Sequence, residues 1–161
     1  MKKARLILST SLVALAASTS IISCGGKDES CAAGYEGKNC DVEIREQLLG
    51  TYDANDVRTA TNETKVYTPT ITKHGTVTVV NIQQFGAFFS GSAELVTSNV
   101  TKAGNVITFD IPNQKPDGEY TVAGKGTYDI SSKKVAITYT LTEPESEGGR
   151  IINSTGNWTK K

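Results

Sequence analysis

Short runs of alternating apolar and polar residues, separated by turn residues, dominate the chain from Gly50 onward. The alternation is clearest in residues 107–111 and 135–141, where bulky apolar side chains alternate with Thr, Asp and Ala. A period of two residues places the apolar side chains on one face of a β-strand and the others on the opposite face. Seven turn signals separate such runs and predict eight strands, at about residues 50–61, 64–73, 76–82, 92–102, 105–111, 118–130, 133–142 and 150–159.

These strands are joined by connections that are nearly all of hairpin length, so each strand pairs most simply with the next in antiparallel fashion. An eight-stranded meander loses its exposed edges when it closes on itself. Gly124 and Gly126 lie inside one long strand, where they allow a sharp bend. Residues 50–161 are therefore predicted to form an all-β, eight-stranded antiparallel up-and-down barrel.

The interior of such a barrel is just wide enough to be filled by side chains or to hold one small ligand. The predicted inward positions are mostly bulky, which favours a filled interior over a hollow one. They are Tyr67, Ile71, Val77, Val79, Ile107, Phe109, Ile111, Tyr120, Val122, Tyr128, Ile137, Tyr139, Leu141 and Trp158.

Residues 42–49 precede the barrel and are predicted to form a short helical lead-in. Asp41 is placed to cap the free amides of a helical turn, and Ile44 and Leu48 lie four residues apart on one face. This face is expected to press against one open end of the barrel.

The first 23 residues have the pattern of a secretory signal peptide. A cationic start, Met1 to Arg5, precedes an uncharged apolar run from Leu6 to Ala17 that is too short to span a bilayer. The following Ile21-Ile22-Ser23-Cys24 resembles the lipobox of bacterial lipoproteins. This resemblance implies cleavage after residue 23 and a diacylglyceryl and acyl lipid on Cys24, which anchors the protein to a membrane. The alternative is an ordinary secretory signal with Cys24 left as a free thiol.

The chain contains three cysteines. If Cys24 carries lipid, Cys31 and Cys40 remain as a pair. Residues 31–41 enclose Gly34-Tyr35 and Gly37 and resemble the last disulfide loop of an EGF-like module, although the earlier cysteines of that module are missing. A metal held by Cys31 and Cys40 is the alternative, but no histidine or further cysteine lies near them in the sequence.

Residues 24–30 are small, polar and charged, as expected for a flexible lipidated tether. Within them, Lys27-Asp28-Glu29 resembles the export signal that sends Bacteroidota lipoproteins to the cell surface. The resemblance implies an outer-membrane protein exposed at the surface. The alternative is a soluble spacer that faces the periplasm.

The barrel region is similar to the calycin or lipocalin-like domains of Bacteroidota surface lipoproteins. The resemblance is carried by Leu49-Gly50-Thr51-Tyr52 at the first strand and by Gly126-Thr127-Tyr128. Lipocalins proper open with Gly-x-Trp, whereas here Tyr52 takes that place and Trp158 stands on the last strand. The resemblance therefore implies an architecture, and no lipocalin ligand is carried over.

Charge argues against nucleic acid as a partner. The whole chain has 17 basic and 17 acidic side chains, and Lys2, Lys3 and Arg5 precede residue 24 while no acidic residue does. The remainder is therefore acidic by three charges, and its basic residues are scattered, whereas nucleic acids require a basic footprint.

Candidate catalytic residues are few. The single histidine, His74, lies in a Lys-His-Gly turn. Asp53 and Asp56 are a candidate pair of carboxylates for glycoside hydrolysis or for binding a cation. Glu143, Glu145 and Glu147 form a second acidic group, but their context is typical of a solvated loop. We therefore expect that the protein is not an enzyme, and that it has no catalytic residue, no metal site and no cofactor beyond the lipid.

A binding site is expected at a barrel mouth, in the longest interruption between strands. Residues 83–91 carry Phe85, Phe88 and Phe89 beside glycine, which could contact an unknown protein, a glycan or a small apolar ligand. Alternatively these rings fold over the barrel end as a buried lid. Exposed rings would favour a binding module, and buried rings would favour a structural or inhibitor lipoprotein with a filled barrel that binds no small ligand.

Overall fold

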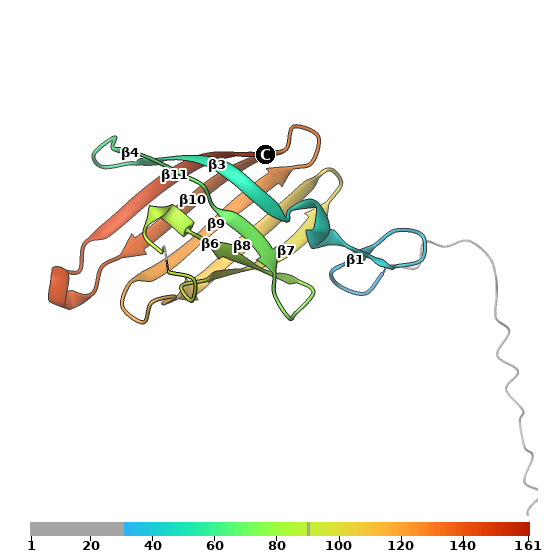
Figure 1. Cartoon of the computed structure of the whole chain (residues 1–161), viewed down its shortest axis with the longest axis horizontal. Coiled ribbons are helices and arrows are strands. Elements are labelled where there is room, and N and C mark those ends of the chain that lie inside the picture. The colour runs from blue at the N-terminus through green and yellow to red at the C-terminus, as the bar shows by residue number, and fades with distance from the viewer. Residues whose placement is uncertain (1–30, 90) are drawn as a thin grey trace, which may run out of the picture.

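A computed structural model describes residues 31–89 and 91–161 and shows an all-β protein (Figure 1). The main sheet closes on itself because β11 pairs with β3, so the predicted eight-stranded antiparallel barrel is confirmed. Every pairing in it is antiparallel and joins neighbouring positions around the barrel. Its strands are β3 (Gly50–Arg58), β4 (Thr64–Tyr67), β5 (Thr70–Lys73), β6 (Val79–Gln83), β7 (Val96–Ala103), β8 (Val106–Gln114), β9 (Thr121–Asp129), β10 (Lys134–Thr142) and β11 (Ile151–Lys160).

The predicted strand at residues 64–73 is broken into β4 and β5, which share one position in the barrel. Both segments pair with β3. Pro69 lies between them and has no amide hydrogen to donate to a ladder. Its carbonyl oxygen still accepts a hydrogen bond from the amide of Tyr52 at 2.9 Å, which keeps the break attached to β3.

For residues 76–82, the sequence predicted the wrong set of inward-facing side chains. Val77 and Val79 are only partly buried, whereas Val80 and Ile82 are fully buried. A turn in which the Val79 amide bonds to the Thr76 carbonyl delays the start of β6. Pairing of Ile82 with Ile71 of β5 then sets which side chains face inward.

The barrel interior is filled by side chains, in agreement with the expectation from the sequence. Trp158 is fully buried at its centre, with ring centroids of Tyr52, Phe85 and Phe109 at 6.0–6.4 Å. Tyr67 and Tyr120 are half-buried and pack against this core. The other predicted inward residues, Val77 and Val79 aside, are buried.

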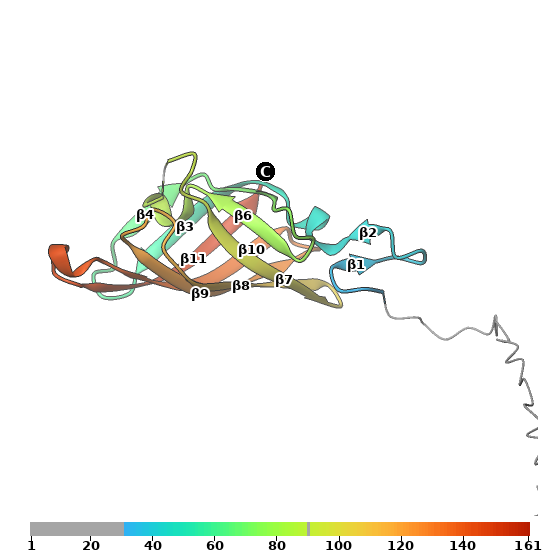
Figure 2. The same cartoon turned by 90° about the horizontal axis from the view of Figure 1, so that it is seen from below.

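A small stub, which we define as residues 31–47, stands at one end of the barrel (Figures 1 and 2). It consists of the hairpin β1 (Tyr35–Glu36) and β2 (Val42–Glu43), followed by a 3-10 turn, η1 (Ile44–Gln47). The helical turn is therefore shorter than the predicted 42–49, and Glu43 rather than Asp41 precedes it. Leu48 is fully buried and Ile44 packs against the core, so both cover the barrel end as predicted.

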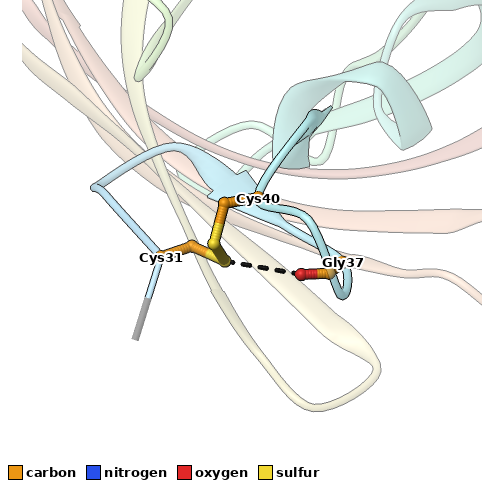
Figure 3. The surroundings of a disulfide bond; sticks show 3 residues. All are labelled: Cys31, Gly37 and Cys40. Atoms are coloured by element: carbon orange, nitrogen blue, oxygen red, sulfur yellow. Dashed lines mark hydrogen bonds between the residues drawn. A yellow bond between two sulfur atoms is a disulfide. The ribbon is translucent and has the colours of Figure 1, made fainter. Parts of the chain in front are cut away.

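The disulfide between Cys31 and Cys40 closes the hairpin of the stub (Figure 3). The carbonyl oxygen of Gly37 lies 3.5 Å from Sγ of Cys31. Because a sulfur atom in a disulfide carries no hydrogen, this approach is a close contact rather than a hydrogen bond. Gly34 and Gly37 have φ angles of 90° and 88°, which glycine adopts readily and other residues rarely do.

Arg45 fastens the stub to the barrel. Its side chain is 5% exposed, and Nη1 donates to the carbonyl oxygens of His74, Thr76 and Val79 at 2.6–2.8 Å. Nε of the same guanidinium donates to Glu43 at 2.8 Å. A second attachment is the ion pair of Lys102 with Glu36 at 2.5 Å. The stub is thus docked on two separate barrel hairpins.

Loss of the disulfide is expected to loosen the stub while the barrel stays folded. In the double variant Cys31→Ser/Cys40→Ser, the short loop loses about 2–3 kcal/mol of chain-entropy stabilisation. The amide of Ile44, which donates to the Gly34 carbonyl at 2.9 Å, should then exchange its hydrogen faster. Hydrogen exchange followed by NMR measures this, with the Val135 amide of β10 as the internal control. Unchanged protection at Ile44 would contradict the expectation.

The stub also defines the two ends of the barrel. We call the end that it covers the proximal end; the turns at residues 74–78, 104–105 and 130–133 lie there. In an up-and-down barrel the alternate turns lie at the other, distal end, and these are residues 59–63, 84–95, 115–120 and 143–150. Figure 1 shows the β10–β11 hairpin projecting from the distal end, opposite the stub. The longer connections therefore gather at the end remote from the stub.

Candidate functional site

The candidate site is a cavity of about 340 Å³ at the distal end, which we call the distal pocket. Three separate parts of the chain enclose it: the end of β3 with the turn that follows, the segment around η2 (Phe85–Ala87), and the two arms of the β10–β11 hairpin. Its lining residues are Arg58, Ala60, Thr61, Phe88, Glu143, Arg150, Ile151, Ile152 and Asn153. Other hollows, of about 410 and 430 Å³, are shallow depressions on the outer face of β9, β10 and β11.

Two ion pairs shape the polar side of the distal pocket. Arg150 holds the carboxylate of Glu143 with two hydrogen bonds of 2.7 and 2.8 Å, although Arg150 is mostly exposed and Glu143 is buried. The bonds from Arg150 keep the pKa of Glu143 below its usual range, so this carboxylate is charged at neutral pH. Arg58 donates to Glu63 at 2.7 Å.

The three phenylalanines of the predicted contact segment divide between core and pocket. Phe85 and Phe89 are 0% and 1% exposed, so neither ring is available to a partner in this structure. The backbone turns sharply here, with φ of 56°, 64° and 59° at Gln84, Gly86 and Ala87, and this directs both rings inward. Phe85 packs edge-on against Tyr139 with centroids 4.7 Å apart.

Phe88 alone of the three lines the distal pocket. Its ring is half-buried, the guanidinium carbon of Arg58 lies 5.2 Å from its centroid, and the ring of Tyr120 lies 6.0 Å away. A cation over an aromatic face is attracted by the ring quadrupole. The expected contact surface is therefore reduced to Phe88, and the lid alternative describes Phe85 and Phe89.

The acids Asp53 and Asp56 do not form a pair. They lie three positions apart on β3 and so point to opposite sides: Asp53 is exposed and bonds Lys161 at 2.9 Å, while Asp56 is 1% exposed inside the barrel. Neither a two-carboxylate catalytic site nor a cation site follows from this geometry.

Asp56 is instead the centre of a closed hydrogen-bond cluster that the sequence reading missed. Its carboxylate accepts from the hydroxyls of Tyr67 and Tyr139 at 2.6 and 2.8 Å, and from the indole nitrogen of Trp158 at 2.9 Å. Burial raises the pKa of Asp56, and the three hydrogen bonds oppose that rise. Across the β3–β11 ladder, Gly156 leaves room for the cluster, because a Cβ there would lie 2.0 Å from Oδ1 of Asp56.

The remaining candidate residues are dispersed. His74 accepts a hydrogen bond at Nδ1 from the Thr76 amide in the proximal β5–β6 turn. Of the acidic hairpin, in which η3 (Glu145–Glu147) forms a 3-10 turn, only Glu143 lines the distal pocket; Glu145 is exposed and Glu147 accepts from the hydroxyl of Tyr120.

Several predicted features lie outside the described residues. They are the signal peptide, the lipidation site Cys24 and the export signal Lys27, Asp28 and Glu29. Within residues 31–89 and 91–161, no three His, Cys, Asp or Glu side chains gather as a metal site requires. In the same residues, no helix has both the length and the apolar character needed to cross a bilayer.

Comparisons with protein-family models, with curated proteins and with solved structures found no match to this chain.

Proposed function

We propose that this protein is an outer-membrane lipoprotein displayed at the cell surface, with a lipid on Cys24 as its anchor. The Cys31–Cys40 disulfide supports the proposal, because it accounts for two of the three cysteines and leaves Cys24 for acylation. A disulfide stub followed by a closed barrel also fits the resemblance to Bacteroidota lipoproteins with an EGF-like loop and a calycin or lipocalin-like domain. Two acyl chains give stable anchoring, which one chain does not.

The barrel of this lipoprotein is proposed to act as a non-catalytic binding module whose site is the distal pocket. The observation that carries this proposal is the position of the pocket, at the barrel end opposite the stub. The proposed tether precedes the stub in the chain, and Arg45 docks the stub on the barrel, so the distal pocket lies at the barrel end remote from the point where the tether joins. A filled interior leaves the mouth as the part of the barrel that a ligand can reach.

A structural or inhibitory lipoprotein that binds no small ligand is the second candidate. The burial of Phe85 and Phe89 favours it, since these rings serve the core rather than a contact surface. The two candidates differ in what the distal pocket does. Binding of a small molecule at residues that line the pocket supports the first, and a pocket that stays empty supports the second.

Surface display is tested by protease treatment of intact cells. We expect the barrel domain to be degraded while a periplasmic marker protein survives. If Lys27-Asp28-Glu29 directs export, substitution of all three residues by alanine should protect the domain until the cells are lysed. Protection of the unmodified protein in intact cells would contradict surface display.

Lipidation is expected to depend entirely on Cys24. Cells grown with an alkyne-bearing fatty acid should incorporate the label into the wild-type protein, because the acyl chains are joined covalently to this residue. The Cys24→Ser variant should carry no label, whereas the matched control Cys31→Ser/Cys40→Ser should keep it. Label on the Cys24→Ser variant would place the lipid elsewhere and contradict the proposal.

A further inference from the structure

The distal pocket has a bias in its hydrogen-bonding groups that indicates the chemistry of its ligand. Its side-chain acceptors are already engaged: both oxygens of Glu143 bind Arg150, Oδ1 of Asn153 accepts from Thr140 at 2.8 Å, and Oγ1 of Thr61 accepts from the amide of Glu63 at 3.3 Å. Among the residues that the structure describes, Nε and Nη2 of Arg58 and Nη1 of Arg150 donate no hydrogen bond. The side chains of the pocket therefore offer unused donors, whereas each of their acceptor oxygens already accepts a hydrogen bond.

Apolar side chains form the other side of the distal pocket. Ile151 is 67% exposed at its lip, and Ile152 is partly buried. Phe88 adds an aromatic ring. A ligand that covered Ile151 would remove apolar surface from water, which is favourable.

The size of the distal pocket limits the ligand further. About 340 Å³ lies at the lower end of the range found for small-molecule sites, so the pocket suits a compact molecule rather than a long chain. Nε and Nη2 of Arg58 form a planar fork that matches the geometry of a carboxylate, whereas the same fork of Arg150 is occupied by Glu143 and only Nη1 of Arg150 is left to add one bond.

We propose that the distal pocket binds a small organic carboxylate with a compact apolar body. Its carboxylate accepts hydrogen bonds from Arg58 and Arg150, and its apolar body lies on Ile151, Ile152 and Phe88. This inference rests on the proposed binding function and adds the class of ligand to it.

The test compares three probes that share one apolar body: 4-methylpentanoate, 4-methylpentan-1-ol and 4-methylpentan-1-amine. The mature lipidated protein is placed in nanodiscs, and binding is followed by NMR shifts of the amides of Ile151 and Ile152. We expect the carboxylate to bind about tenfold more tightly than the alcohol, as a charge-assisted hydrogen bond provides. The amine is expected to bind more weakly than either.

Two variants at the distal pocket connect the preference to its residues. Arg58→Gln should reduce the affinity for the carboxylate to about that for the alcohol, because the fork of donors is lost. Ile151→Glu should weaken carboxylate binding about tenfold or more, because it places a negative charge at an exposed position on the lip. The control Lys134→Gln removes a positive charge at the far end of the barrel and should leave binding unchanged.

The outcomes separate the two proposals. If the alcohol or the amine binds as tightly as the carboxylate, the inferred ligand class is wrong while the distal pocket remains a binding site. If none of the three probes shifts the pocket amides, the inferred ligand class is wrong, and the second candidate, a lipoprotein that binds no small ligand, is favoured. If Lys134→Gln weakens binding as much as Arg58→Gln does, the preference reflects overall charge and the inference is likewise wrong.

Discussion

Asp56→Ala is expected to destabilise the barrel by about 3 kcal/mol or more. The substitution leaves the hydroxyls of Tyr67 and Tyr139 and the indole nitrogen of Trp158 without their acceptor in the core. A buried donor left unpaired costs about 1–3 kcal/mol. Three of them together therefore make this side chain far more important to stability than a typical surface acid. Urea unfolding followed by Trp158 fluorescence measures the loss.

The matched control is Asp53→Ala on the same strand. Asp53 is exposed, and its ion pair with Lys161 lies at the surface, where such pairs contribute little. We expect this variant to unfold at nearly the same urea concentration as the wild type. Equal unfolding midpoints for Asp56→Ala and Asp53→Ala would show that the buried cluster does not stabilise the barrel.

The same cluster predicts a pH dependence. The pKa of Asp56 is raised in the folded state, so the folded protein binds a proton at this residue more tightly than the unfolded chain does. The free energy of unfolding gained from this difference is fully present below the ordinary pKa of 3.8, and it is lost as the pH rises through the raised pKa of the folded state. Asp56→Asn has no such titration. The unfolding free energy of Asp56→Asn should therefore rise relative to that of the wild type as the pH increases through this window.

Gly126→Ala is expected to destabilise the barrel by about 1–3 kcal/mol, although it adds a single methyl group. Gly126 faces inward opposite Phe109 in the β8–β9 ladder, and an added Cβ would lie 2.1 Å from Cζ of that ring. The ring is fully buried against Trp158, so it has no free space into which to move. Thermal or urea unfolding measures the effect.

Gly75→Ala serves as the control for the glycine prediction. An added Cβ at Gly75 would meet no atom within 4 Å, and the backbone there does not adopt a positive φ. This substitution should be neutral or slightly stabilising, because it restricts the unfolded chain. If Gly126→Ala were as stable as Gly75→Ala, the barrel would not depend on the absence of a side chain beside Phe109, and the prediction would be wrong.

The strand pattern predicted the barrel because alternation is a local property that each strand expresses by itself. Residues 107–111 and 135–141 face as expected, and the hairpin connections gave the order of pairing. The failures occurred where local signals competed. Pro69 broke one predicted strand, and a turn at Thr76 shifted the inward face of β6 by one position.

The buried cluster could have been found in the sequence. Tyr52, Ala54 and Asp56 alternate along β3, so the phase that places Tyr52 in the core also places Asp56 there. The same alternation excludes a pair of Asp56 with Asp53, because residues three apart on a strand face opposite sides.

The distal pocket was only partly predictable. The sequence predicted a contact segment at a barrel mouth, and Phe88 of that segment lines the pocket, but Arg58 and Arg150 carried no local signal of their own. They line one pocket because β3 and β11 pair when the barrel closes, and closure brings together segments far apart in the chain. The direction of each ring in residues 84–89 likewise depends on left-handed backbone positions that alternation does not describe.

The central proposal is a barrel held at a membrane by a lipid on Cys24, and the most direct test is the intact mass of the protein purified from the membranes of its native host. We predict a chain that begins at Cys24 and carries the added mass of diacylglycerol and acyl groups, with Cys31 and Cys40 oxidised. A chain that retains residues 1–23, or one that begins at Cys24 with an unmodified thiol, would contradict the proposal.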